Sequence, residues 1–269
     1  MKHQQLLDKL AARHLVQAMD EDLARLVWSA MTFHADDPGA QRDYVLSRLL
    51  ARWNAALLAT DDEVAPIYRD KVAVALATLL HKYGYAEPSI TDRAIDAIDA
   101  LNDAVALDDH FYRRSASFKD ELQTTPTPLS RRPGQPDHTT FYRARDVISI
   151  QLDGRYYAGY VHRLARINES PIIEFYETWF SKLPTLDDLA AVPAHGERFN
   201  DGSVRVSLFS VSGIKYQPDP ANQVTLIAAC VPEPPDNSHL KESIGLFTVK
   251  DIFGIQPQLR GIAAQGADR

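Results

Sequence analysis

The hydrophobic period of this chain changes once, and a proline-rich segment separates the two patterns. Before this segment, apolar side chains recur every three or four positions, as they do on one face of a helix. From residue 147 onward they alternate, as they do along a half-buried strand. The segment itself, residues 123–140, contains four prolines and little apolar content, which suits neither a helix nor a central strand.

This change predicts an α+β protein, in which an N-terminal helical bundle precedes a C-terminal small β-barrel or strongly bent antiparallel sheet. We place a helical domain at residues 1–122, a proline-rich linker at 123–140 and a β-rich domain at 141–269. The chain has 269 residues, of which 45% are hydrophobic, and is therefore long enough to bury a core in each domain.

Local signals predict where the helices of the first domain begin. Two short helices are expected before residue 32, the second capped by Asp20, and Pro38 is well placed to start the next. Residues 60–63 form an acidic N-terminus for a further helix. The most regular pattern spans residues 90–107, with apolar residues on one face and four aspartates on the other: Asp92, Asp96, Asp99 and Asp103. No fixed repeat is evident, so we expect a compact bundle.

The clearest hairpin in the sequence spans residues 147–161. Two alternating segments flank Asp153 and Gly154, a pair that is typical of a tight two-residue turn. Further strands are expected at residues 172–176, 204–209, 224–229 and 246–249, and a short helix is expected near Thr185. Several short strands of this kind favour a barrel or a bent sheet.

The charge of the chain lies mainly in its first part. Residues 1–125 hold 20 acidic and 14 basic side chains, a net charge of −6 out of −7 for the whole chain. Such a surface disfavours nucleic acid and attracts a basic partner, although moderate acidity also simply aids solubility. No apolar run is long enough to cross a membrane, so we expect a cytoplasmic protein that binds no membrane.

The search for catalytic motifs is mostly negative. The sequence has no phosphate-binding glycine loop, dinucleotide fingerprint or zincin pair, and we expect no cofactor and no metal. The single Cys230 excludes an intrachain disulfide and is expected to be a small buried core residue, with a nucleophile as the alternative. Asp108, Asp109 and His110 could form a metal or phosphate site, but charged residues followed by two arginines are more typical of a helix end.

Two groups of side chains could bind a partner. The aspartate row is either a solvated helix face or a binding stripe. The aromatic side chains of the hairpin and the following strand form either a barrel core or a recognition patch: Tyr156, Tyr157, Tyr160, Phe175, Tyr176, Trp179 and Phe180. His34, His81 and His162 are interpreted as isolated, packed histidines.

One segment resembles a known family. Residues 145–161 read RDVISIQLDGRYYAGYV, and residues 171–176 read PIIEFY. This resembles the start of the immunity protein 26 family, whose members have a strand of the form Gly-Asp-Val-Phe-x-Ile-x-Leu, a turn, a strand of the form Gly-x-Tyr-x-x-Gly-x-Val and a third aromatic strand. Arg145 stands where the family pattern has glycine. The resemblance implies a protein that neutralises a bacterial polymorphic toxin by binding, without catalytic residues.

We therefore hypothesise a cytoplasmic immunity protein that is not an enzyme and that blocks a cognate toxin domain, such as one delivered by contact-dependent or type VI secretion. The alternatives are a hydrolase, built on Asp108, Asp109 and His110, that reverses a toxin modification, and a non-enzymatic adaptor module. The expected partner-binding residues are Asp92, Asp96, Asp99, Asp103, Tyr156, Tyr157, Tyr160, Tyr176 and Trp179.

Overall fold

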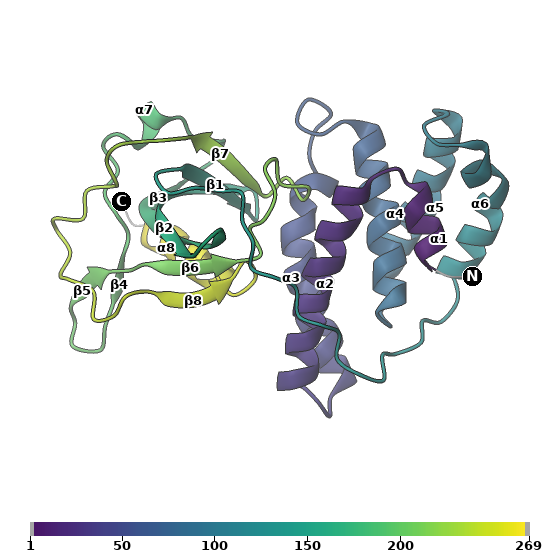
Figure 1. The fold of residues 1–269 in the computed structure, drawn as a ribbon, viewed down its shortest axis with the longest axis horizontal. Helices are drawn as coiled ribbons and strands as arrows, with labels where there is room; N and C mark the ends of the chain where they lie inside the picture. Colours follow the sequence, from purple (N-terminus) through teal and green to yellow (C-terminus); the bar gives the residue numbers. More distant parts are fainter. Residues whose placement is uncertain (1–2, 267–269) are drawn as a thin grey trace. The chain divides into compact units, whose positions relative to one another are not determined.

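The protein is α+β and forms two compact units, Met1–Pro136 and Asp137–Arg269 (Figure 1). The computed structural model describes residues 3–266. The division between the units falls inside the segment that the sequence marks as a linker. Within the described residues, none of the helices combines the length and the apolar character needed to cross a membrane.

The first unit contains six helices among the residues that the structure describes. They are α1 (His3–Lys9), α2 (Arg13–Phe33), α3 (Pro38–Leu57), α4 (Pro66–Lys82), α5 (Pro88–Asp103) and α6 (Asp109–Leu122). Helix α4 is central, since it contacts all five others and residues 72–81 are buried without interruption. A helix that is apolar all round belongs in the middle of a bundle.

Proline and aspartate fix the start of α3, as the sequence predicts. Pro38 occupies the first turn, where its missing N–H leaves no hydrogen bond unmade, and Asp37 accepts a hydrogen bond from the Ala40 backbone N–H at 2.9 Å. The expected cap at Asp20 is wrong, because α2 runs through this residue. The break between the first two helices lies earlier, where Ala11 adopts a φ of +46°.

The proline-rich segment lies against the first unit. Helix α6 ends at Leu122, and residues 123–136 form no helix or strand. Gly84 adopts a φ of +86°, and a Cβ added there would lie 2.7 Å from the Cα atom of Pro128. Arg132 places its guanidinium carbon 5.9 Å from the ring centroid of Trp28 and donates a hydrogen bond to Thr32 at 3.2 Å. Pro128 and Arg132 therefore contact the helices, while residues 123–136 as a whole stay exposed or partly exposed.

The second unit is built on a mixed, open sheet of six strands within residues 3–266. The strands are β1 (Val147–Leu152), β2 (Arg155–Arg166), β3 (Glu169–Phe180), β6 (Phe209–Ser212), β7 (Val224–Ala228) and β8 (Thr248–Asp251). Their order is β7-β1-β2-β3-β6-β8, and β8 runs parallel to β6 whereas the other neighbours are antiparallel. The predicted 147–161 hairpin is confirmed: Leu152 pairs with Arg155, and Asp153 and Gly154 both have positive φ.

The predicted barrel is wrong, and the sheet is not purely antiparallel. Strands β7 and β8 are its two edges, and no pairing within the described residues closes them on each other. The alternation in the sequence shows that strands form, but it does not show which strands pair. The expected strand at 204–209 also divides into β5 (Val204–Val206), which pairs with β4 (Gly196–Arg198), and the separate β6.

Helices complete the second unit. Helix α7 (Leu186–Leu189) begins directly after Thr185, near which a short helix was predicted, and the side chains of Thr185 and Asp188 form a reciprocal capping box. Helix α8 (Gln256–Gly266), which the sequence did not predict, packs against β3. Residues 157–161 of β2 are all buried, and one face of the strand packs against Leu189 of α7 through Ala158 and Tyr160.

Candidate functional site

The aspartate row lies on the solvent face of α5. All four residues are exposed, and the opposite face packs into the bundle through Ile90, Ala94, Ala97, Ile98 and Leu101. Asp99 accepts a hydrogen bond from Lys119 of α6 at 2.5 Å. Asp92, Asp96 and Asp103 therefore offer the more accessible negative charge of this row.

Most of the predicted aromatic patch belongs to the core. Tyr157, Tyr160 and Tyr176 are buried, whereas Tyr156 and Trp179 are half-buried. Burial raises the pKa of Tyr176 to about 12, and the neighbouring Tyr160 adds to this effect. Of the five expected contact residues, only Tyr156 and Trp179 keep substantial surface for a partner. The guanidinium carbon of Arg155 lies 4.4 Å from the ring centroid of Trp179.

The acidic pair with His110 forms the beginning of a helix, not the helix end that the sequence indicated. Asp108 caps α6 by accepting a hydrogen bond from the Phe111 backbone N–H at 2.9 Å, and it also pairs with Lys9 at 3.1 Å. The backbone hydrogen bond lowers the pKa of Asp108, and the Lys9 contact acts in the same direction. The Asp108 carboxylate therefore has a structural role at the helix terminus.

Cys230 and the histidines differ from the expectation. Cys230 is exposed and has a φ of +58°, so it is not a buried core residue. His81 and His162 are packed but not isolated, because each contacts another ionisable side chain. His162 Nε2 lies 2.7 Å from Glu174, a carboxylate with no exposed surface that also accepts a hydrogen bond from Asn237 at 3.1 Å.

An exposed apolar segment adjoins one edge of the sheet. Ile244, Leu246 and Val249 are 70%, 76% and 71% exposed. The backbone of Lys241 pairs with β5 before this segment, and the segment ends in β8, where Val249 belongs to the ladder with β6. The segment is therefore held at both ends while its apolar side chains face solvent. No sequence motif marks this segment, although the predicted strand at 246–249 overlaps it.

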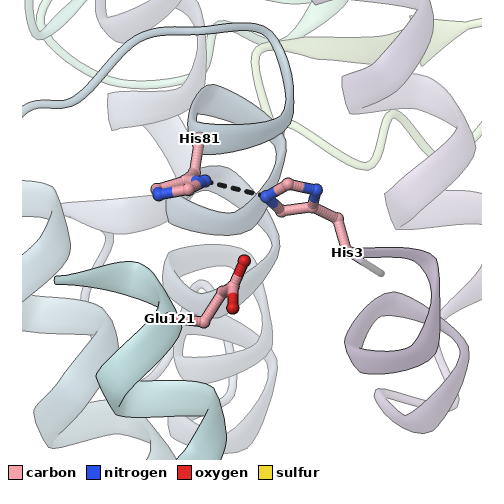
Figure 2. Close-up of side chains that lie close together, drawn as sticks. All are labelled: His3, His81 and Glu121. Carbon is pink, nitrogen blue, oxygen red and sulfur yellow. Dashed lines mark hydrogen bonds between the residues drawn. The ribbon is translucent and has the colours of Figure 1, made fainter. Parts of the chain in front are cut away.

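A cluster of possible metal ligands joins three helices of the first unit. His3 lies at the start of α1, His81 near the end of α4 and Glu121 near the end of α6, and Figure 2 shows the three side chains directed toward one another. His3 Nε2 lies 2.8 Å from His81 Nδ1. One potential ligand atom from each residue lies within 4.8 Å of the others. Sequence separations of 78 and 40 residues explain why no motif revealed this cluster.

The hydrogen bonds of His81 determine its tautomer. Its Nε2 atom lies 3.1 Å from the Thr124 carbonyl oxygen, which can only accept a hydrogen bond. Neutral His81 therefore carries its proton on Nε2, and Nδ1 presents a lone pair to His3. Burial lowers the pKa of His3, and the neighbouring His81 lowers it further, whereas Glu121 opposes this shift.

A small cavity lies beside α8 in the second unit. Its volume is about 160 Å³, and its walls include Phe175, His195, Arg198 and Gln258. His195 Nδ1 and the side-chain oxygen of Gln258 are buried without a hydrogen-bond partner within the described part of the chain. Burial lowers the pKa of His195.

Comparison with known proteins found no matching family model, no matching curated protein and no matching solved structure.

Proposed function

We propose that this chain is an immunity protein that binds a cognate bacterial toxin domain and blocks its activity. The observation that carries this proposal is the exposed apolar segment beside the open sheet edge. Large exposed apolar groups are typical of protein-interaction surfaces, and an unpaired strand edge can add a strand from a partner.

The geometry of β8 suits such an addition. Its ladder with β6 includes a hydrogen bond from the Thr248 N–H to Leu208, and the Ile252 N–H that follows the strand bonds to Ser212, each at 2.8 Å. Alternate residues of a strand direct their N–H groups to opposite sides, so Val249 directs its N–H away from β6. The exposed Val249 side chain and the preceding Leu246 then supply apolar contacts beside these backbone groups.

The hairpin supports assignment to the immunity class. Arg145 stands where the immunity protein 26 pattern has glycine, and it adopts a φ of +73°. Glycine occupies this left-handed conformation without the steric penalty of a Cβ atom. The backbone at residue 145 thus has the left-handed conformation that glycine adopts most easily.

Charge supports a basic partner. The exposed aspartates of α5 belong to the part of the chain that holds most of the negative charge. Long-range attraction by such a face accelerates the encounter with a cationic toxin, while the apolar segment supplies contacts that slow dissociation.

The proposal is tested by co-expressing the full chain with the C-terminal domain of a toxin-like polypeptide encoded beside it. We expect restored growth and a stable stoichiometric complex. Restored growth without a complex contradicts blocking by binding and favours enzymatic reversal. A failure of both growth and binding contradicts the immunity function itself.

Two matched pairs of variants locate the interface. Leu246→Glu should weaken the complex by about tenfold or more, whereas Ile167→Glu, at a side chain that is 91% exposed elsewhere in the same unit, should not. Reversing Asp96 and Asp103 to Lys should slow association at low salt more than the same change at the exposed Asp36 and Asp62. If the test variant and its control change toxin binding equally, the surface that carries the test variant is not part of the interface.

A further inference from the structure

The cluster of His3, His81 and Glu121 has the donor set of a transition-metal site. Two imidazoles and one carboxylate are typical ligands of Zn²⁺, and three protein ligands leave one position of a tetrahedral ion open. The side chains come from three separate helices and converge on one point (Figure 2). We propose that this cluster binds a divalent transition-metal ion, with Zn²⁺ as the fitting example, and that the ion fastens α1 to α4 and α6.

The surroundings of His81 favour this role. Metal-binding histidines usually donate the N–H of their second nitrogen to a carbonyl or carboxylate, which orients the ring. The Thr124 carbonyl fills this position for His81, and the Thr124 hydroxyl lies 3.0 Å from the same nitrogen. The same hydroxyl donates a hydrogen bond to the Glu121 backbone carbonyl at 2.8 Å, so one threonine connects two of the three ligands.

For the ion to enter, the two rings must separate and turn so that both facing nitrogens point at it. The two facing imidazole nitrogens are 2.8 Å apart, and with the proton of His81 on Nε2 the hydrogen bond between the rings is donated by His3 Nε2. Two nitrogens bound to a tetrahedral Zn²⁺ at about 2.0–2.1 Å lie roughly 3.3 Å apart, so the rings must separate by about half an ångström. When His3 moves its proton from Nε2 to Nδ1, both facing nitrogens present lone pairs to the ion. His3 is the first residue of α1 and is only partly buried, so its ring has room to turn.

The ion would link α1, α4 and α6, three helices that lie far apart in the sequence. Helix α1 has seven residues, which is too short to be stable by itself in water. It is held by buried Leu6 and Leu7 against the bundle, and the ligand at its first residue would anchor its other end. A metal that binds the folded state and not the unfolded chain raises the unfolding temperature.

The test uses the full chain without a polyhistidine tag, stripped of metal with a chelator. At a Zn²⁺ concentration of about one hundred times Kd, we expect the unfolding temperature of the helical unit to rise by roughly 5 °C or more. Mg²⁺, which prefers oxygen ligands, should produce no comparable shift. The absence of a Zn²⁺-dependent shift overturns the proposal.

Matched variants identify the ligands. His3→Gln and Glu121→Gln should each weaken Zn²⁺ binding at least tenfold in calorimetric titration, while His110→Gln and Asp120→Asn, on exposed side chains of α6, should leave it unchanged. Equal affinity in all four variants shows binding elsewhere and overturns the assignment. Co²⁺ titration of the unmodified chain gives an independent readout, since a tetrahedral nitrogen-oxygen site produces intense visible absorption bands. An octahedral spectrum contradicts the proposed geometry.

Discussion

Removing the carboxylate of a buried ion pair in the helical unit should cost far more stability than removing that of an exposed pair of the same length. Asp22 of α2 accepts hydrogen bonds from Arg52 at 2.7 Å and from the Trp53 indole at 3.1 Å, and all three side chains are buried. Asp20, two residues earlier, accepts a hydrogen bond from Lys82 also at 2.7 Å, but its side chain is 39% exposed. The two aspartates therefore differ in burial while sharing helix, residue type and contact distance.

The expected magnitudes follow from what each substitution leaves behind. Asp22→Ala leaves the Arg52 cation buried without its carboxylate, which should lower the free energy of unfolding by about 3–5 kcal/mol. Asp20→Ala leaves a Lys82 that water can solvate, and should lower this free energy by at most about 1 kcal/mol. Replacing both buried partners, with Asp22→Leu and Arg52→Met, should be less harmful than Asp22→Ala because no buried cation then loses a carboxylate.

Urea unfolding followed by far-UV circular dichroism measures these differences, because the first unit contributes most of the helical signal. The midpoint should fall sharply for Asp22→Ala and little for Asp20→Ala, with similar slopes. If both single variants lose about the same stability, burial does not set the strength of these contacts, and the reasoning fails.

Two further predictions concern backbone conformation and pH. Gly84 and Gly154 both have positive φ, but of the two only Gly84 would place an added Cβ against neighbouring backbone, at 2.7 Å. Gly84→Ala should therefore lower the unfolding temperature more than Gly154→Ala. The effect of Gly154→Ala should stay near the roughly 1–2 kcal/mol that a left-handed conformation costs a residue with a Cβ atom. Burial lowers the pKa of His195 below 6.5 despite the opposing charges of Glu177 and Glu197, so the unfolded chain binds the proton more tightly. Stability should therefore decrease as the pH falls through about 6.5, and His195→Asn should reduce this decrease in thermal unfolding from pH 7 to 5; an unchanged pH profile would contradict the assignment.

Local sequence patterns predicted the turns and helix starts that depend on neighbouring residues. The Asp153-Gly154 turn, the start of α3 at Pro38 and the cap at Thr185 each depend on residues within a few positions of one another. The change from helical to alternating period likewise predicted helices before strands. Helix α8 is a partial exception, since Ile255, Leu259 and Ile262 have helical spacing and are buried, but Gly261 in its interior weakens the local helical preference.

Only the tertiary structure decided which distant residues meet. The order of the strands, the parallel pairing of β8 with β6 and the burial of both Tyr157 and Tyr160 depend on packing between segments far apart in the chain. The convergence of His3, His81 and Glu121 has the same origin, because the three helices that carry them meet only in the folded bundle. The sequence alone determined where most helices and the main hairpin form, since hydrophobic period and turn chemistry act locally, whereas long-range packing determined which side chains share a site.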